Sequence, residues 1–164
     1  MRYAAYGSNL HPLRLSKRIS SAKLLGTSFL PDWSLRFHKR SLDASGKCNI
    51  VSGGCGIHIA IYDISIADKI TLDKIEGLGS GYVEISLAVP SVGECKSYVA
   101  EGSFIDNSLA PYDWYKELVL VGARVHGFPV EYVDEIDAVM ARQDPDPRRS
   151  AHRWTTVEMI RAGA

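Results

Sequence analysis

The chain has 164 residues with an apolar fraction of 46% and a charged fraction of 23%, which fits one soluble globular domain and excludes a disordered or fibrous protein. Lys plus Arg and Asp plus Glu number 19 each, so the formal net charge is zero. Because a nucleic-acid-binding protein usually carries a basic surplus, we expect no nucleic-acid partner.

The first half of the chain predicts strands with two interposed helices. Ile57, Ile59 and Ile61 alternate with their neighbours in the period of two that is typical of a strand. Gly77 is a natural helix stop, so the helix that follows Ser65 should end near Glu76. In order, we expect a strand over 2–6, a helix over 11–19, two strands between 22 and 38 separated at Pro31-Asp32, a loop over 39–47, strands over 48–51 and 56–62, the helix that ends at 76, and strands over 82–89 and 96–104.

The second half of the chain predicts helices, over 112–125, 130–141 and 155–162. The run Asp144-Pro145-Asp146-Pro147 should not form regular helix. Because strands precede helices and long βαβ alternation is missing, we expect an α+β fold with a curved, mostly antiparallel, barrel-like sheet and flanking helices. Residues 1–164 should form a single domain, with 143–164 as a C-terminal tail.

The cysteine pattern indicates a protein of a reducing compartment, and the apolar segments are too short for a membrane span. Three cysteines without paired spacing argue against a disulfide framework or a zinc site, and the five histidines lack metal-ligand spacing, so we expect no metal. No segment approaches the roughly 20 apolar residues of a membrane span, and no signal-peptide stretch follows Met1. We therefore expect a cytoplasmic protein with no membrane contact.

The loop Tyr6-Gly7-Ser8-Asn9-Leu10 lies between a predicted strand and a predicted helix. Gly7 and Asn9 permit unusual backbone angles, and successive N–H groups beside a helix N-terminus can converge on a carboxylate or an oxyanion. Such a turn is more often an ordinary connection in which Ser8 or Asn9 caps the helix. Both interpretations stay open from these residues alone.

Glu76 lies at the predicted C-terminal end of a helix and precedes the glycine-rich stretch 77–81. The helix dipole and partial burial would both raise the pKa of its carboxyl group, which suits a residue that takes and gives a proton near neutral pH. The common alternative is a solvated carboxylate at a helix end.

Three further stretches have weaker signals. Tyr115 could present its hydroxyl to a site, although the region up to Tyr132 reads more simply as a buried helix pair with close packing at Gly122. The basic segment 37–49 is either part of a substrate mouth or a surface loop. Arg148, Arg149 and Arg153 form a basic run that is usually a solvated face. No serine or cysteine has the flanking residues of a nucleophile.

The motifs together resemble the gamma-glutamylcyclotransferase family, also described as AIG2-like. They occur in order along nearly the whole chain: Tyr6 to Leu10, Leu72 to Gly77, Gly81-Tyr82-Val83, and Tyr115-Lys116 with Gly122-Ala123, Gly127, Pro129 and Tyr132. The resemblance implies cleavage of a gamma-glutamyl amide to 5-oxoproline and a free amine, without a metal or an organic cofactor.

The resemblance also implies roles for individual residues. Glu76 matches the catalytic glutamate, the loop from Tyr6 through Gly7, Ser8 and Asn9 to Leu10 matches the substrate-cradling loop, and Tyr82 and Tyr115 match tyrosines that line the site. The Ser-Asn-Leu form of the loop favours the general branch of the family over the glutathione-specific one. The partner would be a small gamma-glutamyl compound, and a homodimer is compatible with the family. The rival interpretation is a non-catalytic module that binds a small anion or a peptide end.

Overall fold

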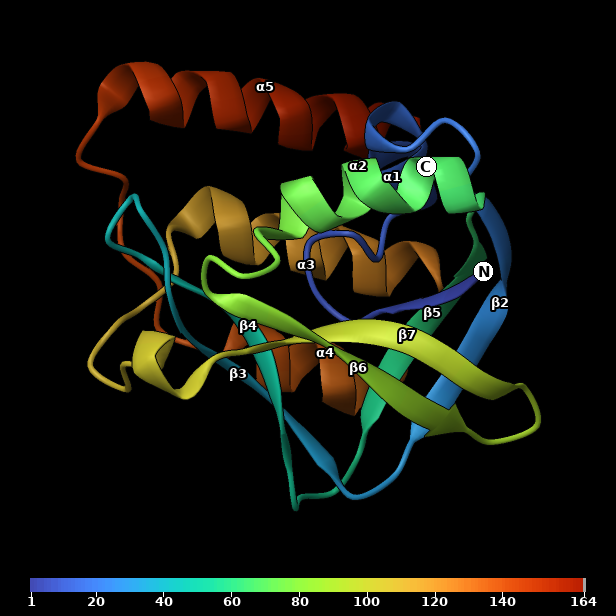
Figure 1. Cartoon of the computed structure of the whole chain (residues 1–164). Coiled ribbons are helices and arrows are strands. Elements are labelled where there is room, and N and C mark those ends of the chain that lie inside the picture. The colour runs from blue at the N-terminus through green and yellow to red at the C-terminus, as the bar shows by residue number, and fades with distance from the viewer. Residues whose placement is uncertain (164) are drawn as a thin grey trace.

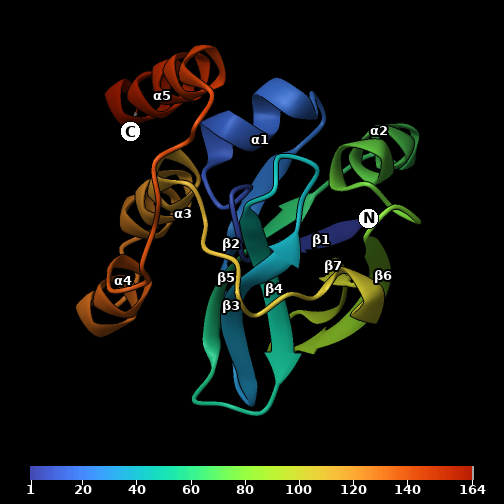
Figure 2. The ribbon, with the colours of Figure 1, turned by 90° about the vertical axis from the view of Figure 1, so that its left-hand side faces the viewer.

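The computed structural model describes residues 1–163, in which the helices of the second half of the chain pack along one side of the strands (Figure 1). Figure 2 shows α3 (Asp113–Val125), α4 (Val130–Asp137) and α5 (Pro147–Ala162) in a row on that side, whereas α2 (Ile66–Glu76) lies on the opposite side. The elements, in chain order, are β1 (Arg2–Ala5), α1 (Pro12–Arg18), β2 (Lys23–Leu30), β3 (Trp33–Arg40), β4 (Gly46–Ser52), β5 (Ile57–Asp63), α2 (Ile66–Glu76), β6 (Tyr82–Val89), β7 (Gly93–Ala100), the 3₁₀ helix η1 (Gly102–Phe104), α3 (Asp113–Val125), α4 (Val130–Asp137) and α5 (Pro147–Ala162).

The strands fall into two sheets. Five lie in the order β2-β5-β1-β7-β6, and β3 and β4 form a separate two-stranded sheet. Neighbouring strands are antiparallel except for β1 and β7, which are parallel. The predicted α+β class is confirmed, although the strands form two sheets rather than one closed barrel. Because β1 is central, its carboxyl end delivers the loop 6–10 to the middle of the molecule.

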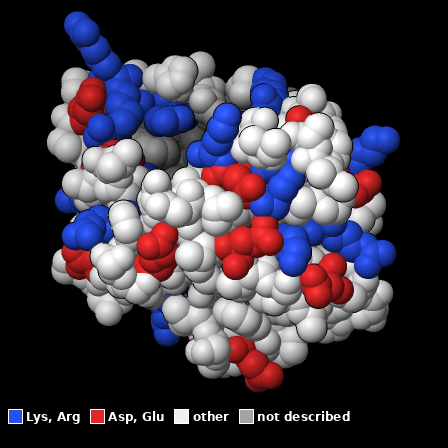
Figure 3. Space-filling model, in the orientation of Figure 1, with Lys and Arg blue, Asp and Glu red and all other residues white. Residues whose placement is uncertain are grey.

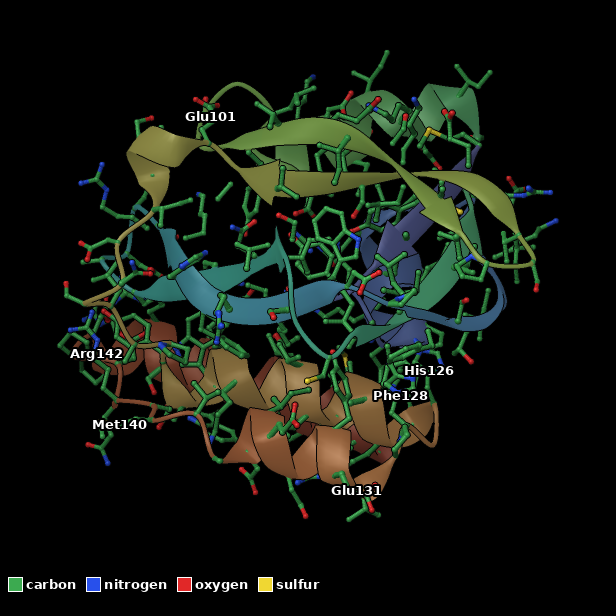
Figure 4. All side chains as sticks on the ribbon, turned by 90° about the horizontal axis from the view of Figure 1, so that it is seen from below. Glu101, His126, Phe128, Glu131, Met140 and Arg142 are labelled. Carbon is green, nitrogen blue, oxygen red and sulfur yellow. The ribbon has the colours of Figure 1, made fainter. Side chains whose placement is uncertain are left out.

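Strand β5 is buried on both faces. Ile57, Ile59 and Ile61 are all buried, as their alternation predicts, but Ala60 and Tyr62 on the opposite face are buried as well. The ring of His58 packs on Phe128 with the centroids 5.1 Å apart. The helix layer therefore covers the second face, and His126 and Phe128 lie side by side where α3 gives way to α4 (Figure 4).

Two strand boundaries differ from the prediction. The expected loop over 39–47 shrinks to 41–45, because Lys39 pairs with Lys47 and Arg40 with Gly46. The Lys39 side chain is buried, and its ammonium group lies 4.7 Å from the centroid of the Tyr82 ring. Cation–π contact of this kind lets a lysine occupy a strand interior that composition alone assigns to a loop. The predicted strand over 96–104 ends at Ala100 and is followed by η1.

The last two helices also differ from the prediction. Helix α4 ends at Asp137, not near residue 141, whereas α5 begins at Pro147, well before the expected Thr155. The prediction treated Pro147 as a helix breaker, but a proline is well suited to the first helical position because its missing N–H has no partner there in any helix. Asp146 caps α5 by accepting hydrogen bonds from the next two free N–H groups.

Asp144 anchors α5 to α3. Its carboxylate accepts hydrogen bonds from the indole N–H of Trp114 at 2.9 Å and from Nε of Arg149 at 2.7 Å. The Arg149 guanidinium holds the pKa of this buried carboxyl well below its usual range. Within residues 1–163, no helix is both long and apolar enough to cross a membrane.

Replacing Asp144 with asparagine should therefore lower the free energy of unfolding in a pH-dependent way. A depressed folded-state pKa stabilises the protein above the ordinary pKa of 3.8, and this stabilisation is lost as the pH falls below that value. Urea unfolding should show a larger difference between wild type and Asp144→Asn at pH 7 than at pH 3. Asp134→Asn, at an exposed position of α4, is the control, and equal differences at both pH values would contradict the anchoring role.

Candidate active site

A small inner cavity lies beside the loop 6–10 and continues into a wider outer basin. The inner cavity has a volume of about 30 Å³ and the outer basin about 240 Å³, and the two share Ser8, Glu76, Tyr82 and Tyr115. The inner cavity is lined by Tyr3, Tyr6, Gly7, Ser8, Asn9, Cys48, Glu76, Tyr82, Tyr98 and Tyr115. The structure thus brings together the loop, Glu76, Tyr82 and Tyr115 from distant parts of the chain; Leu10 is buried behind the loop.

Close packing, rather than an unusual backbone angle, explains the glycine of the loop. Neither Gly7 nor Asn9 has a positive φ angle, so the expectation of special angles is wrong. A Cβ atom on Gly7 would lie 2.9 Å from Cβ of Cys48, closer than side chains pack. The turn is closed by a hydrogen bond of 2.9 Å from the N–H of Leu10 to the carbonyl of Gly7. A residue without a side chain is therefore needed for β4 to approach the loop.

Neither Ser8 nor Asn9 caps the following helix. The N-cap of α1 is His11, whose Nδ1 accepts a hydrogen bond from the N–H of Leu13. Among residues 1–163, the N–H groups of Ser8 and Asn9 donate no hydrogen bond. Both residues line the inner cavity, and an anion-binding loop of the expected kind requires unpaired backbone donors.

Asn9 connects Glu76 to Arg18. Its Nδ2 donates to Oε1 of Glu76 at 2.6 Å and, more weakly, to the hydroxyl of Tyr3 at 3.3 Å. Its Oδ1 accepts a hydrogen bond of 2.6 Å from Nη1 of Arg18. The amide of Asn9 is buried and held at both ends, so it fixes the orientation of the Glu76 carboxylate.

The pKa of Glu76 is raised above its ordinary value of 4.5, mainly because burial disfavours the charged form. Arg18, the hydrogen bond from Asn9, Arg14 and Lys39 act in the opposite direction without cancelling the effect of burial. Glu76 is the last residue of α2, and Gly77 follows in the left-handed conformation, as the sequence predicts. This carboxyl group can therefore exchange a proton at a higher pH than an exposed glutamate.

Asn9→Ala should raise the pKa of Glu76 further, because the variant removes a hydrogen bond to the carboxylate. If catalysis needs the deprotonated form, the acidic limb of kcat/KM should move to higher pH. Stability should fall by about 1–3 kcal/mol, since buried partners are left unpaired. Gln143→Ala, which removes an exposed amide side chain, should change neither quantity, and an unmoved acidic limb in Asn9→Ala would refute the coupling.

Tyr82 and Tyr115 both hold the backbone of Cys48. The Tyr82 hydroxyl donates to the carbonyl of Cys48 at 2.6 Å, and the Tyr115 hydroxyl accepts from its N–H at 3.1 Å. The two tyrosines therefore fix β4 against the cavity as well as lining it. Tyr3, Cys48 and Tyr98 also line the cavity and were not anticipated, because their only signal was an apolar position in a strand.

The outer basin is strongly basic, and most of its residues were missed by sequence reasoning. It is lined by Ser8, Arg14, Arg18, Lys39, Ser41, Asp43, Lys47, Ile75, Glu76, Tyr82, Trp114, Tyr115 and Arg153. Lys39 and Lys47 come from the segment 37–49, which thus contributes to the mouth of the cavity, although as strands. Arg153 faces the basin, whereas Arg148 is exposed and Arg149 pairs with Asp144. Arg14 and Arg18 are four residues apart, so they lie on the same face of α1. This spacing could have predicted that the two arginines act together.

The other stretches singled out in the second half of the chain are structural. A Cβ on Gly122 would lie 2.5 Å from Cβ of Leu10, so α3 packs directly on the loop. Lys116 donates to the carbonyls of Asp137 and Val139, and Tyr132 is buried away from the inner cavity. Within residues 1–163, no group of three His, Cys, Asp or Glu side chains is placed to hold a metal ion.

Comparison with known proteins agrees with this arrangement. Residues 56–136 match the model of the AIG2-like family. The chain is 31% identical over 146 residues to gamma-glutamylcyclotransferase of Bos taurus, which covers 84% of this chain and 77% of the bovine one, and 29% identical over 148 residues to the Homo sapiens protein with the same coverage. A solved structure of a gamma-glutamyl cyclotransferase superposes with a TM-score of 0.84 at 25% identity, covering 96% of this chain and 98% of the other.

The fold and the cavity define an α+β protein with a partly buried carboxyl group beside a basic basin. The chain belongs to the gamma-glutamylcyclotransferase family.

Proposed function

We propose that this protein converts a gamma-glutamyl amide to 5-oxoproline and a free amine, with Glu76 as the general acid and base. The observation that carries the proposal is the Glu76 carboxyl group, which has a raised pKa and lies in a cavity beside two free N–H groups of the loop. A similar reaction is implied by the names of the relatives.

The reaction needs little from the protein beyond positioning and proton transfer. The substrate's α-amine attacks its own γ-carbonyl carbon, a new C–N bond closes a five-membered ring, and the original amide C–N bond breaks. Glu76 takes a proton from the α-ammonium group and returns one to the leaving nitrogen, and the second proton that the ring nitrogen loses goes to solvent or to the released amine. Holding the chain folded can contribute up to ~7–11 kcal/mol, and the proton transfers about 10²–10⁴-fold in rate.

The backbone N–H groups of the loop and two tyrosines would bind the substrate. The N–H groups of Ser8 and Asn9 are suited to a substrate carboxylate or to the oxyanion that forms at the γ-carbonyl. Tyr82 and Tyr115 would enclose the glutamyl part, because both line the inner cavity as well as the basin. No enzyme nucleophile is required.

Product identification tests the proposal. The purified protein is incubated with gamma-glutamyl amino acids, gamma-glutamyl amines and glutathione, and the products are identified by mass spectrometry. We expect 5-oxoproline and the free amine. Glutamate in place of 5-oxoproline would indicate a hydrolase in which water attacks, and no product from any compound would favour the binding module.

A further inference from the structure

The outer basin carries more positive charge than the chemistry of Glu76 requires. Five cationic side chains line it, against the two carboxylates Asp43 and Glu76. One of the two is already used, because Asp43 forms an ion pair of 2.8 Å with Lys47. On the face of the molecule drawn in Figure 3, Lys and Arg side chains rim a hollow below α5.

The other four cations, Arg14, Arg18, Lys39 and Arg153, form no ion pair within residues 1–163. Arg18 donates to the uncharged amide of Asn9, and Lys39 lies over the Tyr82 ring. Three arginines outside the basin do pair with carboxylates: Arg149 with Asp144, and Arg124 and Arg161 with Glu117.

Two of these arginines also have a buried donor without a partner. Nε of Arg14 and Nε of Arg153 are buried and have no hydrogen-bond partner among the described residues. The Arg153 guanidinium lies 5.4 Å from the Trp114 ring, which fixes its plane from one side. A buried unpaired donor is costly, so such groups are commonly completed by a ligand or by water.

The cations also destabilise one another. Burial lowers the pKa of Arg14 to about 10, and the positive charges of Arg18 and Arg153 act in the same direction. An anion in the basin would relieve this repulsion and could form charge-assisted hydrogen bonds with the guanidinium groups that line it.

We infer that the preferred substrates release an amine that carries more than one negative charge, an acidic amino acid rather than a neutral or cationic amine. This inference rests on the proposed function. The γ-carbonyl group would lie beside Glu76, where the inner cavity meets the basin, and the leaving group would extend into the basin that Arg14 and Arg153 line. A cationic leaving group, such as the amine of a gamma-glutamyl diamine, would meet net repulsion there, because five cationic side chains face two carboxylates.

The test compares two substrates of equal size, gamma-glutamyl-glutamate and gamma-glutamyl-glutamine. For the wild type, kcat/KM should be about tenfold or more higher for the acidic leaving group, as expected for one charge-assisted hydrogen bond. The preference should reside mainly in KM and should shrink as ionic strength rises, because salt screens the basin.

Arg153→Gln should lower the ratio of the two kcat/KM values to about the square root of the wild-type ratio, or less. Arg153→Lys keeps the positive charge and should restore part of this ratio. Arg148→Gln makes the same charge change at an exposed position of α5 and should keep the wild-type ratio. Equal kcat/KM values for the two substrates in the wild type would overturn the inference while leaving the proposed function intact. Absence of 5-oxoproline from every substrate would instead overturn the proposed function. The wild-type comparison decides the matter even if Arg153→Gln fails to fold.

Discussion

Glu76→Gln is expected to lower kcat by about 10²–10⁴-fold, the usual contribution of a positioned acid–base group. Glutamine keeps the volume of the side chain, and its carbonyl oxygen can still accept the hydrogen bond from Asn9. What it cannot do is take a proton from the α-ammonium group of the substrate. The loss should therefore appear in kcat, measured as 5-oxoproline formed under saturating substrate.

The same variant should be no less stable than the wild type at neutral pH. The pKa of Glu76 in the folded protein is raised above its ordinary value of 4.5. Ionised Glu76 therefore lowers the free energy of unfolding, and this loss develops as the pH rises from 4.5 through the folded-state pKa. Removing the charge removes this cost, and thermal unfolding at pH 7 should show an unchanged or higher Tm.

Glu131→Gln is the matched control, because Glu131 is exposed on α4 at the outer side of the helix layer (Figure 4). It should change neither kcat nor Tm. Activity of Glu76→Gln within a few-fold of the wild type would exclude Glu76 as the acid–base residue, whatever the product.

The second large effect is expected at Gly122, which is buried near the C-terminal end of α3. Alanine is favoured over glycine in a helix by about 1 kcal/mol, so helix propensity alone predicts that Gly122→Ala stabilises the protein. The contacts predict the reverse, because the added Cβ would lie 2.5 Å from Cβ of Leu10 and 3.1 Å from the backbone nitrogen of His11. Overpacking of this kind typically costs about 1–3 kcal/mol.

The loop would have to move for the methyl group to fit. Leu10 is held by hydrogen bonds to its carbonyl from Tyr62 and from Nε2 of His126, so the strain is passed to Ser8 and Asn9. A displacement of about 1 Å at a positioning group can cost about 10²-fold in rate. We therefore expect Gly122→Ala to lose both stability, measured by urea unfolding, and kcat/KM.

Gly102→Ala provides the control for this substitution, since a Cβ there meets no atom within 4 Å. It should leave both measurements near the wild-type values. A more stable Gly122→Ala variant with full activity would show that the loop tolerates the displacement and that its position is not critical.

The sequence by itself determined the local features of the site. The position of Glu76 at a helix end followed from the Ser65 cap and from Gly77, which needs a left-handed angle that glycine adopts without strain. The bounds of β6 and the turn at residues 31–32 followed in the same way. These signals are short in range, because capping, alternation and turn chemistry involve residues within a few positions of one another.

Tertiary structure alone decided how the site is completed. Gly7 proved to be required by the approach of Cys48, not by its own backbone angle, and Asn9 proved to join Glu76 to Arg18. The basin combines Arg14 from α1 with Arg153 from α5, which lie near opposite ends of the chain. A basic residue has the same local signature on a solvated face as in a basin, because charge and helical spacing do not show what packs beside it. Only the packing of α5 on α3 and of β4 on the loop makes that difference.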